Sequence, residues 1–314
     1  MMDEGVLWAP DGRHFAVLSM DSGSVFNVYL FDREGTWVGE APGDKAAWVG
    51  DNALMVLPYD PTSQDGLVPA YIASIGYNDV GTMQVLPGRY SGIVGSDTCA
   101  VALETAQGYA LWLNGSLQPA VVCGCGVLAI SPDGSLIAVE DSIGVKVVET
   151  ADGRNVRSWP HLGTGAHPNA SFSPDGQHLA LSDVYGSLNT LVSLSISNGR
   201  RADLLTGHFA SGGTWSGNAQ LLAGDDAGGW WLLAADGASA RRAGLPTFSS
   251  AAVSSSAGSI AAVDDSGSML LVSRSDETAA TPLPSRDEFL LYWSPDGSEI
   301  VVGCESGVVV VARP

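Results

Sequence analysis

A five-residue pattern recurs along the chain and limits the folds that it can adopt. In its complete form an apolar residue is followed by Ser-Pro-Asp-Gly, and the first copy has alanine in place of serine. The copies lie at residues 8–12, 130–134, 172–176 and 293–297. Pro, Asp and Gly in this order fill the positions of a type I turn that favour them. Each copy therefore predicts the end of one strand and a tight turn into the next.

The spacing of the pattern is nearly constant over the whole chain. When the apolar residues before each turn are aligned, the intervals between neighbours are 40, 45, 37, 42, 43, 38 and 40 residues. The aligned residues are Trp8, Trp48, Ile93, Ile130, Phe172, Trp215, Val253 and Trp293. Four of these turns are degenerate, but each still carries turn-forming residues at the expected place. A period in this range is typical of folds that repeat one supersecondary unit.

Each unit is expected to hold four short strands joined by tight turns. An apolar strand precedes the first turn, a second follows it, and a third comes after a turn that begins with Asp or Glu and ends with Gly. Dipeptides such as Asn114-Gly115 and Asp152-Gly153 then predict a hairpin into a fourth strand. No 12-residue window has sustained helical periodicity. The sequence thus predicts an all-β fold, a β-propeller with eight blades of four antiparallel strands, as a single domain over residues 1–314. Seven blades are the alternative if one weak unit is out of register.

The last unit begins at Phe289 and ends after its third strand, so its outer strand is missing. That third strand carries four consecutive valines, Val308, Val309, Val310 and Val311. A strand without a neighbour on one side exposes unpaired backbone groups. We expect this edge to be closed by a strand of a longer parent chain or by a partner.

The charge of the chain disfavours some partners. It has 14 Lys and Arg residues against 34 Asp and Glu residues, a formal net charge of −20. An acidic surface repels phosphate backbones, so we expect no nucleic-acid partner; basic partners or cations fit better, and the charge also maintains solubility. The sequence has no apolar run of 18 residues, so we expect no membrane span. Its acidic first residues differ from a signal peptide. We expect a cytoplasmic protein as written, or an extracytoplasmic one if the chain belongs to a longer exported protein.

The four cysteines are too few for a disulfide framework in a chain of this length. Cys123 and Cys125 are one residue apart, which is shorter than the two-residue spacer of common zinc sites. We expect the cysteines to be small buried apolar side chains. A disulfide from Cys99 to one of this pair is the alternative.

The apolar-Ser-Pro-Asp-Gly turn followed by an apolar strand resembles the repeats of TolB-type and WD-repeat propellers over essentially the whole chain. One unit is more specifically similar to a WD repeat. Gly207-His208 matches the Gly-His dipeptide that opens such repeats, Asp225 lies in the next tight turn, and Trp231 follows six residues later. Because the family's residues hydrogen-bond across the blade, the resemblance implies a structural role for His208, Asp225 and Trp231. The family's closing Trp-Asp dipeptide is absent.

The residues with the chemistry to bind are expected on one face of the propeller. The loops between blades share that face with the turns between second and third strands. We expect it to carry His161, His167, His208, Asp183, Asp225, Asp226 and Tyr185. Imidazoles and carboxylates on adjacent blades can hold a divalent metal. The alternative is that His208 pairs with Asp225 and the others are solvated loop residues. We favour this alternative and predict no metal and no cofactor.

Adjacent tryptophans and long loops are further candidates for binding. Trp230 and Trp231 are neighbours on one strand and face opposite ways, so one is expected to pack between blades and the other is free to anchor a partner. Most other tryptophans precede turns and are expected to pack between blades. The longest loops, at residues 59–67, 159–169, 205–214 and 280–288, fall on the same predicted face.

The sequence favours a non-enzymatic platform that presents a loop-rich face to a protein or peptide. It contains no Gly-x-Ser-x-Gly elbow, phosphate loop or His-Glu-x-x-His motif, so we predict no catalytic residue. The first alternative is a propeller hydrolase or lyase with a metal or an acid and base at the central channel. The second is a sensor domain cut from a larger kinase or envelope protein.

Overall fold

The computed structural model describes residues 5–20, 26–76, 80–160, 162, 170–185, 188–207, 213–225, 229–243, 248–254, 259–264, 269–274, 277–283, 289–304 and 307–312. Within these residues the chain forms 32 strands and no helix. An all-β chain is what the sequence predicts. The structure divides into two compact units, Met1–Asn155 and Val156–Pro314.

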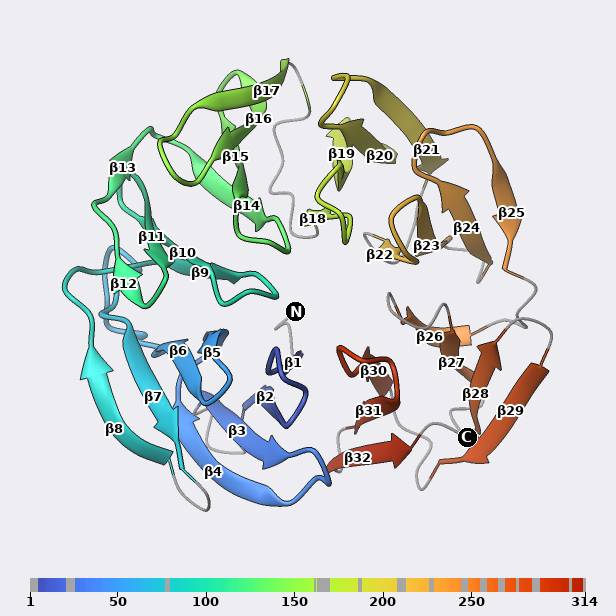
Figure 1. The fold of residues 1–314 in the computed structure, drawn as a ribbon, viewed down its shortest axis with the longest axis horizontal. Coiled ribbons are helices and arrows are strands. Elements are labelled where there is room, and N and C mark those ends of the chain that lie inside the picture. The colour runs from blue at the N-terminus through green and yellow to red at the C-terminus, as the bar shows by residue number, and fades with distance from the viewer. Residues whose placement is uncertain are drawn as a thin grey trace. The chain divides into compact units, whose positions relative to one another are not determined.

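In the first unit the described strands form antiparallel sheets that follow the chain order (Figure 1). The first sheet has β1 (Val6–Trp8), β2 (His14–Met20), β3 (Phe26–Asp32) and β4 (Trp37–Pro42). The second has β5 (Lys45–Gly50), β6 (Ala53–Leu57), β7 (Tyr71–Ile75) and β8 (Val80–Val85). The third has β9 (Gly92–Gly95), β10 (Val101–Thr105), β11 (Gly108–Leu113), β12 (Ser116–Leu117) and β13 (Val121–Val122). The fourth has β14 (Gly126–Ile130), β15 (Leu136–Asp141), β16 (Gly144–Glu149) and β17 (Asn155–Pro160).

The described strands of the second unit continue the same pattern. The fifth sheet has β18 (Ser171–Phe172), β19 (His178–Tyr185), β20 (Leu188–Ser195) and β21 (Arg201–Gly207). The sixth has β22 (Thr214–Trp215), β23 (Gln220–Gly224), β24 (Trp230–Ala234) and β25 (Ala240–Arg242). The seventh has β26 (Phe248–Val253), β27 (Ile260–Asp264), β28 (Met269–Arg274) and β29 (Glu277–Pro282). The eighth has β30 (Phe289–Trp293), β31 (Glu299–Cys304) and β32 (Gly307–Ala312). Each repeat unit in the sequence therefore corresponds to one sheet.

The recurring turns are held by a serine hydroxyl that bonds to the aspartate of the turn and to the first residue of the next strand. Ser131 Oγ donates to Asp133 Oδ1 at 2.6 Å and accepts the N–H of Leu136 at 2.9 Å. The N–H of Gly134 closes the turn on the Ser131 carbonyl at 2.8 Å, and Gly134 takes the left-handed φ of 72° that favours glycine. Equivalent bonds hold the other two complete copies of the pattern. The motif is thus a hydrogen-bonded lock between the first two strands of a sheet.

Tryptophans before the turns link neighbouring sheets within each unit. In each case the indole N–H donates to a backbone carbonyl on the first strand of the preceding sheet. The bonds are Trp48 to Leu7 (2.9 Å), Trp215 to Ser171 (3.1 Å) and Trp293 to Ala252 (3.3 Å). The sequence analysis predicts that tryptophans before turns pack between successive repeats, and this is confirmed for Trp48, Trp215 and Trp293.

The hydrophobic core lies between the faces of neighbouring sheets. In the first unit, Ala16, Val28 and Leu30 of the first sheet pack with Leu54 and Val56 of the second. All five side chains are fully buried. Leu103 of the third sheet packs in the same way with Met55 of the second sheet in a further cluster. Burial of both faces explains why the strands are short apolar runs rather than strict alternations of apolar and polar residues.

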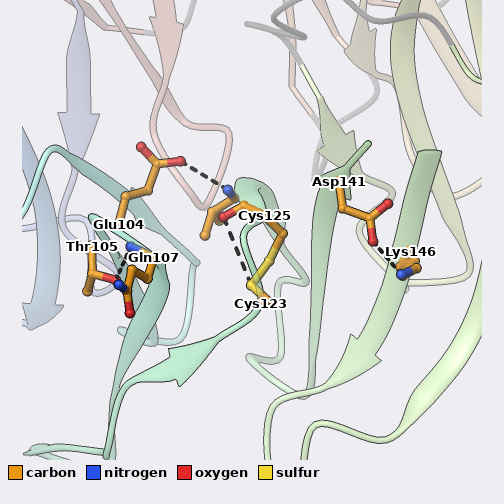
Figure 2. Close-up of a disulfide and its surroundings, with 8 residues drawn as sticks. Glu104, Thr105, Gln107, Cys123, Cys125, Asp141 and Lys146 are labelled. Carbon is orange, nitrogen blue, oxygen red and sulfur yellow. Dashed lines mark hydrogen bonds and ion pairs between the residues drawn. A yellow bond between two sulfur atoms is a disulfide. The ribbon is translucent and has the colours of Figure 1, made fainter. Parts of the chain in front are cut away.

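The prediction of buried apolar cysteines is wrong for Cys99, Cys123 and Cys125, and the side chain of Cys304 lies outside the described residues. Cys123 and Cys125 form a disulfide with each other, with Cα atoms 5.2 Å apart (Figure 2). Cys123 is exposed, and Cys125 is half-buried and packs against a core cluster of the third and fourth sheets. Cys99 is a free thiol and is not bonded to either of them. The turn at Gly124, with φ of 59°, brings the two cysteines together across a single residue.

Within the described residues the eighth sheet has three strands, in the order β30-β31-β32. The valines Val308, Val309, Val310 and Val311 lie on β32, which is the outermost of the three. The absence of a fourth strand there agrees with the sequence analysis. Pairing of this edge with a partner stays a prediction.

Candidate functional site

The structure shows a groove of about 810 Å³ in the first unit. Its walls come from the third and fourth sheets. The lining residues are Thr98, Ala100, Leu111, Leu113, Asn114, Gln118, Pro119, Val121, Asp133, Gly134, Ser135, Thr150, Ala151, Asp152 and Gly153. A volume of this size lies in the range of ligand-binding pockets.

Four turns form the groove, and all of them lie at the same end of their sheets. The turn after β9 and the recurring turn after β14 each join a first to a second strand. The hairpins after β11 and β16 each join a third to a fourth strand. In an up-and-down sheet these connections share one end, and the turns between second and third strands lie at the other. The groove is therefore on the face opposite to the one that the sequence analysis favours for binding.

The floor of the groove is a close contact between two turns. A Cβ atom at Gly134 would lie 2.8 Å from Ala100 Cβ and 3.1 Å from Thr98 Oγ1. The carbonyl of Gly134 accepts the Thr150 hydroxyl at 2.7 Å. Position 134 therefore requires glycine for two reasons: its φ of 72° is left-handed, and the third sheet approaches too closely for a side chain.

The charge of the groove is negative. Asp133 and Asp152 line it, and no lysine or arginine does so among the described residues. Burial acts to raise the pKa of Asp133, but the hydrogen bonds from Ser131 and Ser135 outweigh it and hold that pKa below its ordinary value. Asp152 accepts the N–H of Arg154 at 2.9 Å. The carboxylate of Asp133 is therefore ionised at neutral pH, and the groove attracts cationic groups.

One rim of the groove is the interrupted outer strand of the third sheet. The hairpin Asn114-Gly115 has left-handed φ values of 51° and 76°, which correspond to the predicted two-residue turn. The chain then pairs with β11 at β12, leaves the ladder through Pro119, and pairs with β11 again at β13. Val121 is 37% exposed and Val122 is 73% exposed. Val121 lines the groove, and Val122, its neighbour on β13, points to the opposite face of the strand.

Most of the residues predicted to bind a partner lie outside the described residues. His161, His167, His208 and Asp226 fall outside the described residues. Tyr185 is the last residue of β19 and pairs in register with Leu188, at the predicted end of the sheet. Asp183 lies two residues earlier on the same strand. The binding roles proposed for these residues stay predictions.

The WD-like residues Asp225 and Trp231 lie together in the second unit. Trp231 Nε1 donates to Asp225 Oδ2 at 2.7 Å, and the N–H of Gly229 donates to Asp225 Oδ1 at 2.6 Å. The guanidinium of Arg242 lies 5.6 Å from the centre of the Trp231 ring. Asp225 and Trp231 are thus bonded within the sixth sheet, and the structural role proposed for them and for His208 stays a prediction.

Trp230 is half-buried and packs against the side chains of Leu222, Leu232 and Val253, on the side opposite to Trp231. Its ring also lies over Gly224, whose added Cβ would be 3.3 Å from it. Neither tryptophan is among the large exposed apolar side chains. Trp230 therefore offers a partner only part of its ring, and its role as an anchor stays a prediction.

The long loop at residues 59–67 lies at the end of the second sheet that the sequence analysis favours. It has its own polar network, in which Arg89 Nη1 lies 3.3 Å from Asp65 Oδ2 and Arg89 also donates to the Leu67 carbonyl. Tyr59 is 51% exposed and contacts Phe26 edge-on, with ring centres 4.7 Å apart. The loop is held by these bonds.

The described residues contain no cluster of three or more His, Cys, Asp or Glu side chains that could hold a metal ion. They also contain no helix, and hence none that could cross a membrane. The sequence analysis missed the groove because its turns were interpreted only as structural. The available signal was their coincidence: turns at 96–99 and 133–135 and hairpins at 114–115 and 152–153 belong to successive units and must meet at one end.

Comparison with known proteins places the fold. No protein-family model matches the chain, and no curated protein matches it. Among solved structures, it is similar to the β-propeller domain of Myceliophteria thermophila Cps50 (Swd1), with 11% identity, a TM-score of 0.52 and coverage of 99% of this chain and 96% of that one. It is also similar to the dihydro-heme d1 dehydrogenase NirN in complex with DHE, with 16% identity and a TM-score of 0.50 over 98% of this chain and 63% of that one. The Dos1 propeller matches with 13% identity and a TM-score of 0.49, over 98% and 76% of the two chains.

At these identities the similarity concerns the fold alone. Together with the sheets of consecutive antiparallel strands, it shows that the chain is an all-β protein with a β-propeller fold. The chain spans less than two thirds of NirN.

Proposed function

We propose that this chain is a non-enzymatic interaction platform that binds a basic, extended peptide segment of a partner protein in the groove of the first unit. The observation that carries the proposal is the groove itself, about 810 Å³ in volume and lined by two carboxylates without a cationic residue among its described walls. The WD-repeat resemblance and the propeller fold support a binding role, since propellers display loops on a rigid body.

The surroundings of the groove favour a peptide over a compact ligand. Hydroxyl and amide groups of Thr98, Asn114 and Gln118 can bond to a peptide backbone, and the carboxylates can pair with Lys or Arg side chains. The exposed Val121 at the rim extends the contact along β13, where an extended chain can continue and a small molecule cannot. The overall charge of −20 adds long-range attraction for a basic segment.

The proposal is tested by selecting binding peptides and then blocking the groove. Peptides selected from a displayed random library against the whole chain are expected to be rich in Lys and Arg. Their affinities, measured by fluorescence anisotropy, should weaken as salt is raised, because the attraction is screened.

Two tryptophan variants separate the groove from the opposite face. Ala151→Trp fills the groove, and Ile143→Trp places the same bulk on a side chain that is 61% exposed in the turn after β15. The account expects at least a tenfold weaker affinity for Ala151→Trp and no change for Ile143→Trp, with unchanged melting temperatures for both. Equal binding by Ala151→Trp and the parent protein, or peptides without basic enrichment, would contradict the proposal.

A further inference from the structure

The disulfide at Cys123-Gly124-Cys125 lies on the surface of the first unit, in the link from β13 to β14 (Figure 2). Cys123 is exposed and Cys125 half-buried. The nearest elements of the third sheet form its base. Exposed disulfides are open to attack by thiolates, whereas buried structural ones are not.

The backbone holds this link in place without help from the disulfide. The N–H groups of Cys123 and Gly124 both donate to the Gln107 carbonyl, at 3.0 and 2.8 Å. On the far side, the N–H of Val127 donates to Glu104 Oε1 at 3.0 Å. Reduction would therefore leave the two thiols close together, ready to form the bond again.

The same disulfide is poorly placed to stabilise the fold. A cross-link stabilises mainly by restricting the unfolded chain, and the restriction is smallest when the closed loop is short. The sequence separation here is 2. This disulfide adds little to stability, is exposed, and lies on a link that backbone hydrogen bonds already hold in place. These are the properties of a reactive disulfide rather than a structural one.

We propose that Cys123 and Cys125 form a thiol–disulfide exchange site whose substrate is a cysteine thiol in a peptide segment. The substrate thiolate attacks Cys123 Sγ, the bond between the two cysteines breaks, and its electron pair leaves on Cys125, which takes up a proton from water. A second substrate thiolate attacks the mixed disulfide and releases Cys123 as a thiolate. In total, two substrate thiols become one disulfide, and the cysteine pair gains two electrons and becomes a dithiol.

The surroundings favour a peptide thiol over a small anionic one such as glutathione. Val122 next to Cys123 is 73% exposed and offers an apolar contact. The chain carries a net charge of −20, which repels a glutathione anion. Neither argument depends on the groove, so this site and the proposed function stand or fall separately.

The experiment uses the whole chain with Cys99→Ser, which leaves the pair and Cys304 as its cysteines. The oxidised protein is incubated with a neutral peptide that carries two cysteines, or with glutathione at the same thiol concentration. Reaction is followed by mass spectrometry after alkylation. We expect the native protein to be reduced by the peptide in a reversible equilibrium, several-fold faster than by glutathione. Urea midpoints of the oxidised and reduced forms should be the same.

Two variants test the roles of the sulfur atoms and their surroundings. For trapping, Cys125→Ser, added to Cys99→Ser, is incubated with a single-cysteine form of the peptide that has been oxidised to its disulfide-linked dimer. The Cys123 thiolate attacks this disulfide, one peptide leaves as a thiolate, and the other stays on Cys123 as a mixed disulfide, with the peptide's mass added once. Val122→Glu should slow the reaction of the protein with the peptide several-fold, relative to the reaction of the same variant with glutathione. The groove variant Ala151→Trp should exchange at the parent rate. Reduction only after denaturation, a lower urea midpoint of the reduced form, or no trapped adduct on Cys123 would overturn the proposal.

Discussion

The contact between Gly134 and Ala100 gives the sharpest test of how the floor of the groove is built. Gly134 and Gly153 both have φ of 72°, but a Cβ at Gly134 would meet Ala100 Cβ at 2.8 Å, and a Cβ at Gly153 would have nothing within 4 Å. The change of each glycine to alanine therefore carries the same conformational strain, and only one of them adds a steric clash. Gly153→Ala is the matched control for Gly134→Ala.

The magnitudes follow from these two terms. A left-handed alanine costs about 1–2 kcal/mol, and the reduced freedom of the unfolded chain returns roughly 0.4–1 kcal/mol. For Gly153→Ala the free energy of unfolding should therefore fall by about 1 kcal/mol. Non-bonded carbon atoms prefer separations of about 3.5–4.0 Å, and overpacking of this kind costs roughly 1–3 kcal/mol. The Gly134 turn is fixed by its bond to Ser131, so we expect a total loss of about 2–4 kcal/mol for Gly134→Ala.

Urea unfolding of the whole chain, followed by tryptophan fluorescence, measures both changes. The further variant Ala100→Gly removes the opposing Cβ, so in combination with Gly134→Ala it should recover about 1 kcal/mol or more of the loss. Equal losses for Gly134→Ala and Gly153→Ala, together with additive effects of Ala100→Gly, would show that the two turns do not touch and would refute the reasoning.

Four further predictions concern the repeated contacts. Ser173→Ala removes a buried hydroxyl that bonds to Asp175 and to the N–H of His178, so it should lower the free energy of unfolding by about 1–3 kcal/mol in urea titrations. Ala9→Ser places that hydroxyl where the first copy lacks it, and should raise the urea midpoint; a drop would count against the hydroxyl as the lock. Trp48→Phe loses the bond to the Leu7 carbonyl and should cost about 1 kcal/mol by thermal unfolding, with no cost if the indole N–H is irrelevant. The depressed pKa of Asp133 adds stability that is complete above the ordinary value of 3.8 and is lost as the pH falls through the folded value. Asp133→Asn should therefore flatten the dependence of the urea midpoint on pH below about 4, and an unchanged slope would contradict this assignment.

The repeated features could be predicted from the sequence because they depend on local chemistry. The recurring turns and the hairpin at Asn114-Gly115 are specified by residues that are adjacent in the chain. The link from Trp48 to the preceding sheet could be anticipated because the repeat period places a tryptophan at the same point of several units. A constant period also located the sheets whose turns are degenerate.

The meeting of the four turns could be predicted from the repeat period, but the rim of the groove and the disulfide could not, because they depend on where one strand leaves its ladder. The outer strand of the third sheet breaks at Pro119, and this break opens the rim of the groove. It also leads the chain through Val122 to the exposed turn at Gly124. Proline indicates such a break, but the sequence does not say how the two halves of the strand pair again with β11. The partial burial of Trp230 likewise depends on a cluster that includes Val253, a residue of another sheet.

The central claim, that a basic peptide binds in the groove, is tested most directly by hydrogen–deuterium exchange of the whole chain with and without a selected peptide. The account predicts slower exchange in residues 113–121, 133–136 and 150–154, with residues 59–67 and 141–144 unchanged. Protection confined to residues 59–67 and 141–144 would place binding on the opposite face and contradict the account.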